Sequence, residues 1–134
     1  MNKEIDLLEE TGKLLPRPVR RDEYEGGVRL IGGDPGVVVA EFRGGKILLS
    51  QYDAIWEGPH TLTVRPIPLV TVECDDMTGE ERAEVVKSLI RLISKRRRKL
   101  YERCQYCNKL TAPEYQHGDD TCQGCAQREL GVDY

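Results

Sequence analysis

Residues 28–52 read VRLIGGDPGVVVAEFRGGKILLSQY, and this stretch decides the fold class. It contains three runs of β-branched and aliphatic residues bounded by glycines, at 28–31, 36–42 and 46–52. Between the first two runs, GGDPG is a turn sequence, because proline presets one φ angle and glycine adopts angles that other residues avoid. Between the last two, Gly44-Gly45 predicts a two-residue hairpin turn, which requires positive φ. The stretch therefore predicts adjacent antiparallel strands.

Strand patterns continue on the C-terminal side of this stretch. YDAIWEGPH at 52–60 is expected to be a longer loop, and TLTVRPIPLVTVEC at 61–74 predicts one or two further strands. Pro66 and Pro68 cannot donate a hydrogen bond to a neighbouring strand, so they favour a sheet edge or a bend. Across residues 19–74 we expect an antiparallel sheet of four or five strands.

A long helix is predicted after the sheet. Thr78 and Glu81 form a capping box, in which each side chain satisfies a free backbone N–H group at the helix start. Apolar residues then recur at helical spacing, and two more widen the stripe: Ala83, Val86, Leu89, Ile90 and Ile93, then Val85 and Leu92. This stripe predicts packing on the sheet. Beyond Ser94 the sequence is KRRRK, and a helix unbroken to Arg103 would be about 37 Å long and would deliver Cys104 outside the core.

The N-terminal residues carry weaker signals. Four leucines have roughly helical spacing: Leu7, Leu8, Leu14 and Leu15. Gly12 interrupts this pattern, and Pro16 and Pro18 stop it. Residues 1–18 are therefore expected to be a weakly structured arm.

Four of the five cysteines form two C-x-x-C pairs, Cys104/Cys107 and Cys122/Cys125, separated by fourteen residues. This spacing is typical of a tetrahedral zinc site, so we predict one structural Zn²⁺ per chain bound by the four thiolates. Disulfides are the first alternative, which an expected cytoplasmic location disfavours. An iron site also remains open.

The residues around the cysteines indicate how the site is built. Asn108 readily adopts the left-handed conformation of a metal knuckle. Gly118 and Asp119 fit the tip of a hairpin, and Gly131 fits the end of a helix that begins at the second cysteine pair. Knuckle, hairpin and helix resemble a treble-clef zinc finger over residues 103–131. His117 is expected at a loop tip, solvated rather than bound to metal.

The predicted fold is thus α+β: a small antiparallel sheet of four to five strands with one long packed helix and a C-terminal treble-clef-like zinc finger. The predicted division is an N-terminal arm at 1–18, a domain of sheet and helix at 19–103, and the finger at 104–134. At 134 residues the chain suffices for one modest core and a small satellite.

Two families share parts of the C-terminal pattern. RCQYC at 103–107 resembles the start of HNH nucleases, but these need a catalytic histidine and a further helix. Here His117 precedes Gly118 and Asp119, and the interval is too short, so no enzymatic activity is expected. A basic helix that leads into a four-cysteine finger is similar to DksA/TraR-type transcription regulators, although their acidic-tipped coiled coil is missing. Neither resemblance assigns functional residues.

Charge is unevenly distributed. The chain has net charge −3, yet residues 85–103 carry eight cations against one glutamate, a net +7, so the remainder carries −10. Guanidinium groups suit phosphate recognition, and the tentative nucleic-acid contacts are Lys95, Arg96, Arg97, Arg98, Lys99 and Arg103. The alternative is a solvated helix face, compensated by acidic groups elsewhere in the chain.

We therefore expect a non-enzymatic, zinc-binding regulatory protein that contacts nucleic acid through its basic helix. The competing hypothesis is a protein–protein adaptor or inhibitor with a purely structural finger. No apolar run approaches the ~20 residues of a membrane span, and the acidic N-terminus does not resemble a secretory signal. We expect a cytoplasmic protein with no membrane partner and no evident small-molecule substrate.

Overall fold

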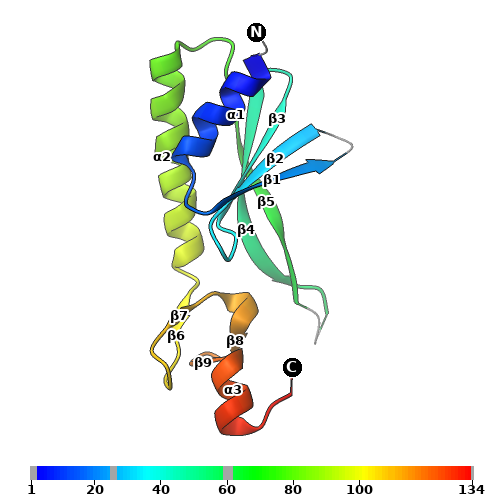
Figure 1. The fold of residues 1–134 in the computed structure, drawn as a ribbon, viewed down its shortest axis with the longest axis vertical. Helices are drawn as coiled ribbons and strands as arrows, with labels where there is room; N and C mark the ends of the chain where they lie inside the picture. Colours follow the sequence, from blue (N-terminus) through cyan, green and yellow to red (C-terminus); the bar gives the residue numbers. More distant parts are fainter. Residues whose placement is uncertain (1–2, 25–26, 59–61, 134) are drawn as a thin grey trace.

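The computed structural model describes residues 3–24, 27–58 and 62–133, and it places two helices on one face of a five-stranded antiparallel sheet (Figure 1). The strands follow in sequence order across the sheet: β1 (Val19–Tyr24), β2 (Gly27–Gly32), β3 (Val38–Arg43), β4 (Lys46–Trp56) and β5 (Leu62–Glu73). The helices are α1 (Lys3–Leu14) and α2 (Gly79–Arg98). The α+β class predicted from the sequence is confirmed.

The middle of the sheet follows the pattern of residues 28–52. Val38, Ala40 and Phe42 alternate along β3 and contribute to the core against the helices, as expected for a strand with one face against a helical layer. Gly44 (φ 51°) and Gly45 (φ 77°) make the tight turn between β3 and β4, which confirms the predicted hairpin.

The ends of the sheet differ from the prediction. The loop expected at 52–60 is wrong as far as Trp56, because β4 continues to that residue and pairs with β5; residues 59–60 lie outside the described residues. The two prolines of β5 do lie in an edge strand, and the register shifts beside Pro68, between Leu49 and Ser50. Strand β1 was not specifically predicted, because its sequence VRRDEY is mostly charged.

Helix α2 begins where the capping box predicted. The Thr78 hydroxyl accepts a hydrogen bond from the Glu81 backbone N–H group at 3.2 Å. Val86, Ile90 and Ile93 are buried against the sheet. The predicted widening of the stripe is wrong, since Val85 and Leu92 are exposed.

The helix ends at Arg98, so the extension to Arg103 does not occur. Instead, Glu102 and Arg103 pair with Leu110 and Thr111 as a short two-stranded ladder. This ladder brackets the first cysteine pair. Cys104 therefore follows a strand rather than a helix, although it does lie outside the main core cluster as expected.

Residues 3–14 form helix α1 rather than a weakly structured arm. Leu7, Leu8 and Leu15 are buried in the core, and Glu10 pairs with Arg82 of α2 at 2.7 Å. Helices of this length are marginal in isolation and gain stability by packing an apolar face. This tertiary contribution outweighs the local cost of Gly12, and the prediction for this segment is corrected.

The C-terminal segment lies beyond the end of α2 and beside the far end of the β4–β5 hairpin (Figure 1). It consists of short elements: β6 (Glu102–Arg103), β7 (Leu110–Thr111), the 3₁₀ turn η1 (Pro113–Tyr115), β8 (Gln116–His117), β9 (Thr121–Cys122) and α3 (Gln123–Leu130). In the described part of the chain, no helix is both long and apolar enough to cross a membrane.

Candidate metal centre and its attachment to the sheet

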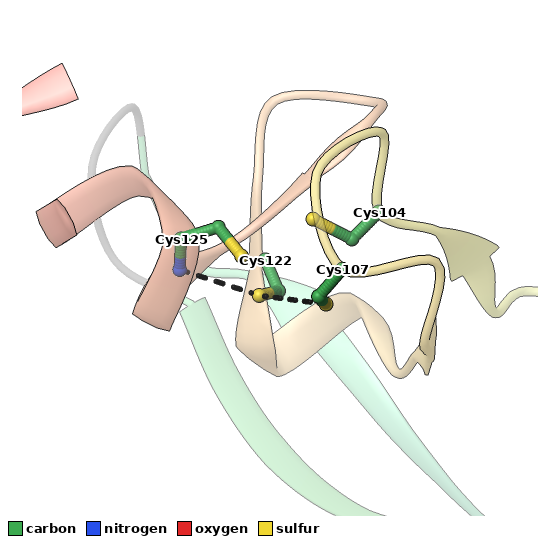
Figure 2. Close-up of side chains that lie close together, drawn as sticks. All are labelled: Cys104, Cys107, Cys122 and Cys125. Carbon is green, nitrogen blue, oxygen red and sulfur yellow. Dashed lines mark hydrogen bonds between the residues drawn. The ribbon is translucent and has the colours of Figure 1, made fainter. Parts of the chain in front are cut away.

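The four predicted cysteines meet in one cluster. Sulfurs of Cys104, Cys107, Cys122 and Cys125 all lie within 4.8 Å of one another, and Figure 2 shows them converging from the knuckle and from the start of α3. The Cys107 and Cys122 sulfurs are 3.8 Å apart. A tetrahedral ion with Zn–S bonds of about 2.3 Å places its sulfurs roughly 3.8 Å apart. The cluster can therefore hold a metal ion with small adjustments.

The first pair lies in a knuckle. Asn108 has φ 59°, the left-handed conformation expected from the sequence. Its backbone N–H group donates to the Cys104 carbonyl at 2.9 Å, and the Cys104 N–H group donates to the Lys109 carbonyl at 3.0 Å. A further N–H group, that of Tyr106, points at the Cys104 sulfur at 3.4 Å. The knuckle thus turns both sulfurs of the pair to the same side.

The second pair lies at the start of α3. Cys122 caps this helix, and its sulfur accepts from the Cys125 backbone N–H group at 3.4 Å. Gly131 ends the helix with φ 70°, as predicted. The hairpin β8–β9, with Gly118 at its tip, leads into the pair. Free N–H groups at a helix start favour negative charge on the sulfurs.

The pKa values of two cysteines in the cluster depart from their ordinary value, in opposite directions. Burial opposes ionisation of Cys104, but backbone hydrogen bonds around its sulfur lower its pKa to about 6. Burial and the neighbouring sulfurs raise the pKa of Cys125 to about 12. Metal ligation requires deprotonated thiols, so a bound divalent cation would favour the thiolate form of all four side chains.

Arg128 contacts the cluster, and the sequence prediction did not include it. It follows Cys125 by three residues on α3, and its guanidinium group donates to the Cys125 sulfur at 3.1 Å. Four thiolates around a divalent ion carry a net charge of −2, so a cation at this position offsets part of the excess. The (i, i+3) spacing of a helix was the signal that could have identified it.

Other predicted features of the finger are placed as follows. His117 lies in β8 and does not belong to the four-ligand cluster. None of the five cysteines forms a disulfide. The donor set of four thiolates suits both zinc and iron–sulfur chemistry.

The prediction that Arg97 contacts nucleic acid is wrong. Its side chain is fully buried, with 0% exposure, and cannot reach a phosphate. It follows Ile93 by four residues and Ile90 by seven, so it continues the buried stripe of α2 that the sequence analysis ended at Ile93. That spacing was the signal that could have placed it inward.

The buried guanidinium group of Arg97 joins the sheet to the finger. It donates to the Gly36 carbonyl at 3.2 Å and to both carboxylate oxygens of Glu114, one of them at 2.6 Å. Asp53 of β4 lies 3.7 Å away, and the Tyr101 ring lies below the guanidinium group at 5.1 Å. Gly36 and Asp53 belong to the sheet region and Glu114 to η1 of the finger, so one side chain bridges the two.

Apart from Arg97 and Arg82, which pairs with Glu10, the cations of α2 and of its C-cap Lys99 are exposed. These are Lys87, Arg91, Lys95, Arg96, Arg98 and Lys99. Among the described residues none of these six forms an ion pair. Arg103 is also exposed, and it donates to the Asn108 carbonyl at 3.1 Å. Of the predicted contacts, five remain accessible and Arg97 does not.

Comparison of the chain with protein-family models, with curated proteins and with solved structures found no match.

Proposed function

We propose that the four cysteines bind one structural Zn²⁺ in a treble-clef-like finger. The geometry of the sulfurs supports this proposal, together with the knuckle turn at Asn108 and the helix that carries the second pair. Elemental analysis of protein prepared without added metal is expected to give one zinc per chain. Two disulfides found by mass spectrometry, with no metal, would contradict the proposal, and iron in place of zinc would correct its cofactor.

We further propose that the protein is a non-enzymatic, nucleic-acid-associated regulator that contacts phosphates through α2. The carrying observation is that the six exposed cations of this helix have no carboxylate partner in the described chain, although the remainder of the chain is acidic. Like charges this close together repel one another. A polyanion would relieve that repulsion, and the acidic side chains of the described residues do not.

The test is the salt dependence of binding to a duplex oligonucleotide. Phosphate contacts release counterions, so the logarithm of the affinity should fall linearly with the logarithm of salt concentration, with a slope of about −3 for three or four contacts. Charge reversal at Arg96, Arg98 and Lys99 should abolish binding. Arg97 is left unchanged, because reversing a buried charge would unfold the protein.

A matched control reverses three exposed cations away from α2: Lys13, Arg17 and Arg20. This triple variant changes the net charge by the same amount and should retain most of the binding. Equal loss in the two variants would mean that only net charge matters. A flat salt response, or no binding at low salt, would contradict the nucleic-acid proposal and favour the adaptor hypothesis.

A further inference from the structure

An open groove lies between residues 14–16, at the C-terminal end of α1, and the C-terminal half of α2. Its volume is about 640 Å³, within the range of pockets that hold ligands. The floor is mainly apolar, formed by Leu14, Leu15, Pro16, Ile90 and Ser94, and cations line its side: Arg91, Lys95, Arg98 and Lys99. The groove thus combines an aliphatic surface with one sign of charge.

In the described part of the chain, Ser94 is the one uncharged polar residue in the lining of the groove. Its side chain is buried, with 8% exposure, and its hydroxyl oxygen has no hydrogen-bond partner among the described residues. Buried polar groups are normally paired in native structures.

The chain itself shows what packs on α2. Helix α1 has the sequence KEIDLLEETGKL, which combines four acidic residues with three leucines. Leu7 and Leu8 are buried in the core, and the Glu10 carboxylate accepts two hydrogen bonds from Arg82, at 2.7 and 3.3 Å. Helix α1 ends at Leu14, where the groove begins, and the α2 cations beyond it have no ion-pair partner in the described chain.

We propose that this groove binds an acidic, leucine-bearing peptide segment of a partner protein. Its carboxylates pair with Arg91, Lys95, Arg98 and Lys99, and an aliphatic side chain packs on Leu14 and Pro16, continuing the chemistry of the α1–α2 contact. A nucleic acid would contact the cations but leave the floor unused, because no aromatic ring of the described residues lines the groove for base stacking. This inference goes beyond the proposed function and does not rest on it.

The experiment measures fluorescence anisotropy of a labelled peptide of about 12 residues, rich in glutamate and leucine and long enough to span the groove as a helix. A second peptide replaces every leucine with serine and keeps the charge. The serine peptide should bind at least about tenfold more weakly, since each buried leucine contributes on that order. Equal binding of the two peptides, or no binding of either, overturns the proposal.

Variants locate the site. Lys95→Glu with Arg98→Glu should weaken peptide binding at least about tenfold, whereas Arg96→Glu with Arg103→Glu, outside the groove, should change it less than about threefold. Leu14→Gln reduces the apolar area of the floor without changing the net charge, and it should also weaken peptide binding. Circular dichroism checks that each variant is folded. If the two double variants lose peptide binding equally, the proposal that the peptide binds in the groove is wrong.

A labelled duplex of about 20 base pairs separates this inference from the proposed function. Leu14→Gln should leave its binding unchanged, while Arg96→Glu with Arg103→Glu should weaken it. If Leu14→Gln instead weakens duplex binding as much as it weakens peptide binding, the groove is a nucleic-acid site and the peptide proposal fails. If the peptide binds as expected and the duplex does not bind, only the proposed function fails.

Discussion

An arginine keeps its charge when buried, because the guanidinium group does not release its proton in proteins. Arg97 therefore needs a permanent counter-charge, and Glu114, itself only 9% exposed, supplies it. Asp53 is more exposed and more distant, so it compensates only in part. At the scale of single residues, this pair is a buried link between the helix that packs on the sheet and the finger.

Glu114→Gln should destabilise the protein by about 3 kcal/mol, since removing one partner leaves an uncompensated buried charge. Urea unfolding followed by circular dichroism measures this loss. Glu129→Gln, on the exposed side of α3, is the matched control and should change stability little. The double variant Arg97→Met/Glu114→Gln should lose less than the sum of the two single variants. Strict additivity would show that the pair is not coupled.

Arg128→Gln should weaken metal binding on the order of tenfold, as groups that contact metal ligands usually do. The reason is that the guanidinium group stabilises the negative charge of the Cys125 sulfur. Competition with a chromophoric zinc chelator gives the affinity. Gln127→Ala, one residue away and exposed, should leave it unchanged. An unchanged affinity in Arg128→Gln would assign its contact to packing alone.

Elements with a local signal could be predicted from the sequence. The glycine turn at 44–45, the Thr78 cap and the knuckle at Asn108 each depend on residues that are neighbours in the chain. The approach of the four cysteines could be predicted as well, because two C-x-x-C pairs are the spacing with which four thiolates bind one tetrahedral metal ion. These features need no knowledge of the rest of the fold.

The elements that escaped prediction depend on distant partners. Helix α1 is stabilised by burying Leu7 and Leu8 against other elements, and β1 pairs along β2 in spite of its charges. Strand β4 extends to Trp56 because β5 is long enough to pair with it. The inward position of Arg97 was missed for a different reason, since its charge hid a helical spacing already present in the sequence.

The finger should depend on its metal for folding. The buried residues of this segment are small or polar apart from its cysteines: Thr111, Ala112, Thr121 and Ala126. A segment with so little apolar area cannot offset its conformational entropy without metal. Chelation, or Cys107→Ser, should therefore unfold the finger. In NMR spectra the amide signals of residues 103–133 should then lose their dispersion and move to random-coil positions. Retention of these signals in strong chelator would reveal a source of stability other than the metal.

On the scale of the whole molecule, the finger and the sheet are linked through Arg97. When the finger unfolds, Glu114 leaves and the arginine stays among buried residues. Loss of metal should therefore lower the stability of the sheet as well, even though the sheet remains folded. The Tm of the sheet and of helices α1 and α2 is expected to fall on chelation. In the Glu114→Gln variant chelation should lower the Tm less, because the contact with Arg97 is already weakened.

Cys74 reports on this linkage, because it lies after β5 among the buried core residues. Burial raises the pKa of its thiol above the ordinary value, so less thiolate is present at neutral pH and alkylation is slow. After chelation the finger cysteines should react with iodoacetamide within the time in which Cys74 stays protected. Mass spectrometry of the modified peptides separates the two classes. Equally rapid modification of Cys74 would mean that the sheet unfolds together with the finger.

The two prolines of β5 have a consequence for the behaviour of concentrated protein. The unpaired N–H and C=O groups of an edge strand can form hydrogen bonds with a strand of another molecule, and sheets grow into aggregates in this way. Pro66 and Pro68 remove donors from one edge, and the opposite edge, β1, carries Arg20, Arg21 and Glu23 exposed. Neither border of the sheet is a good template for fibril growth. The sheet thus carries protection against self-association in the composition of its outermost strands.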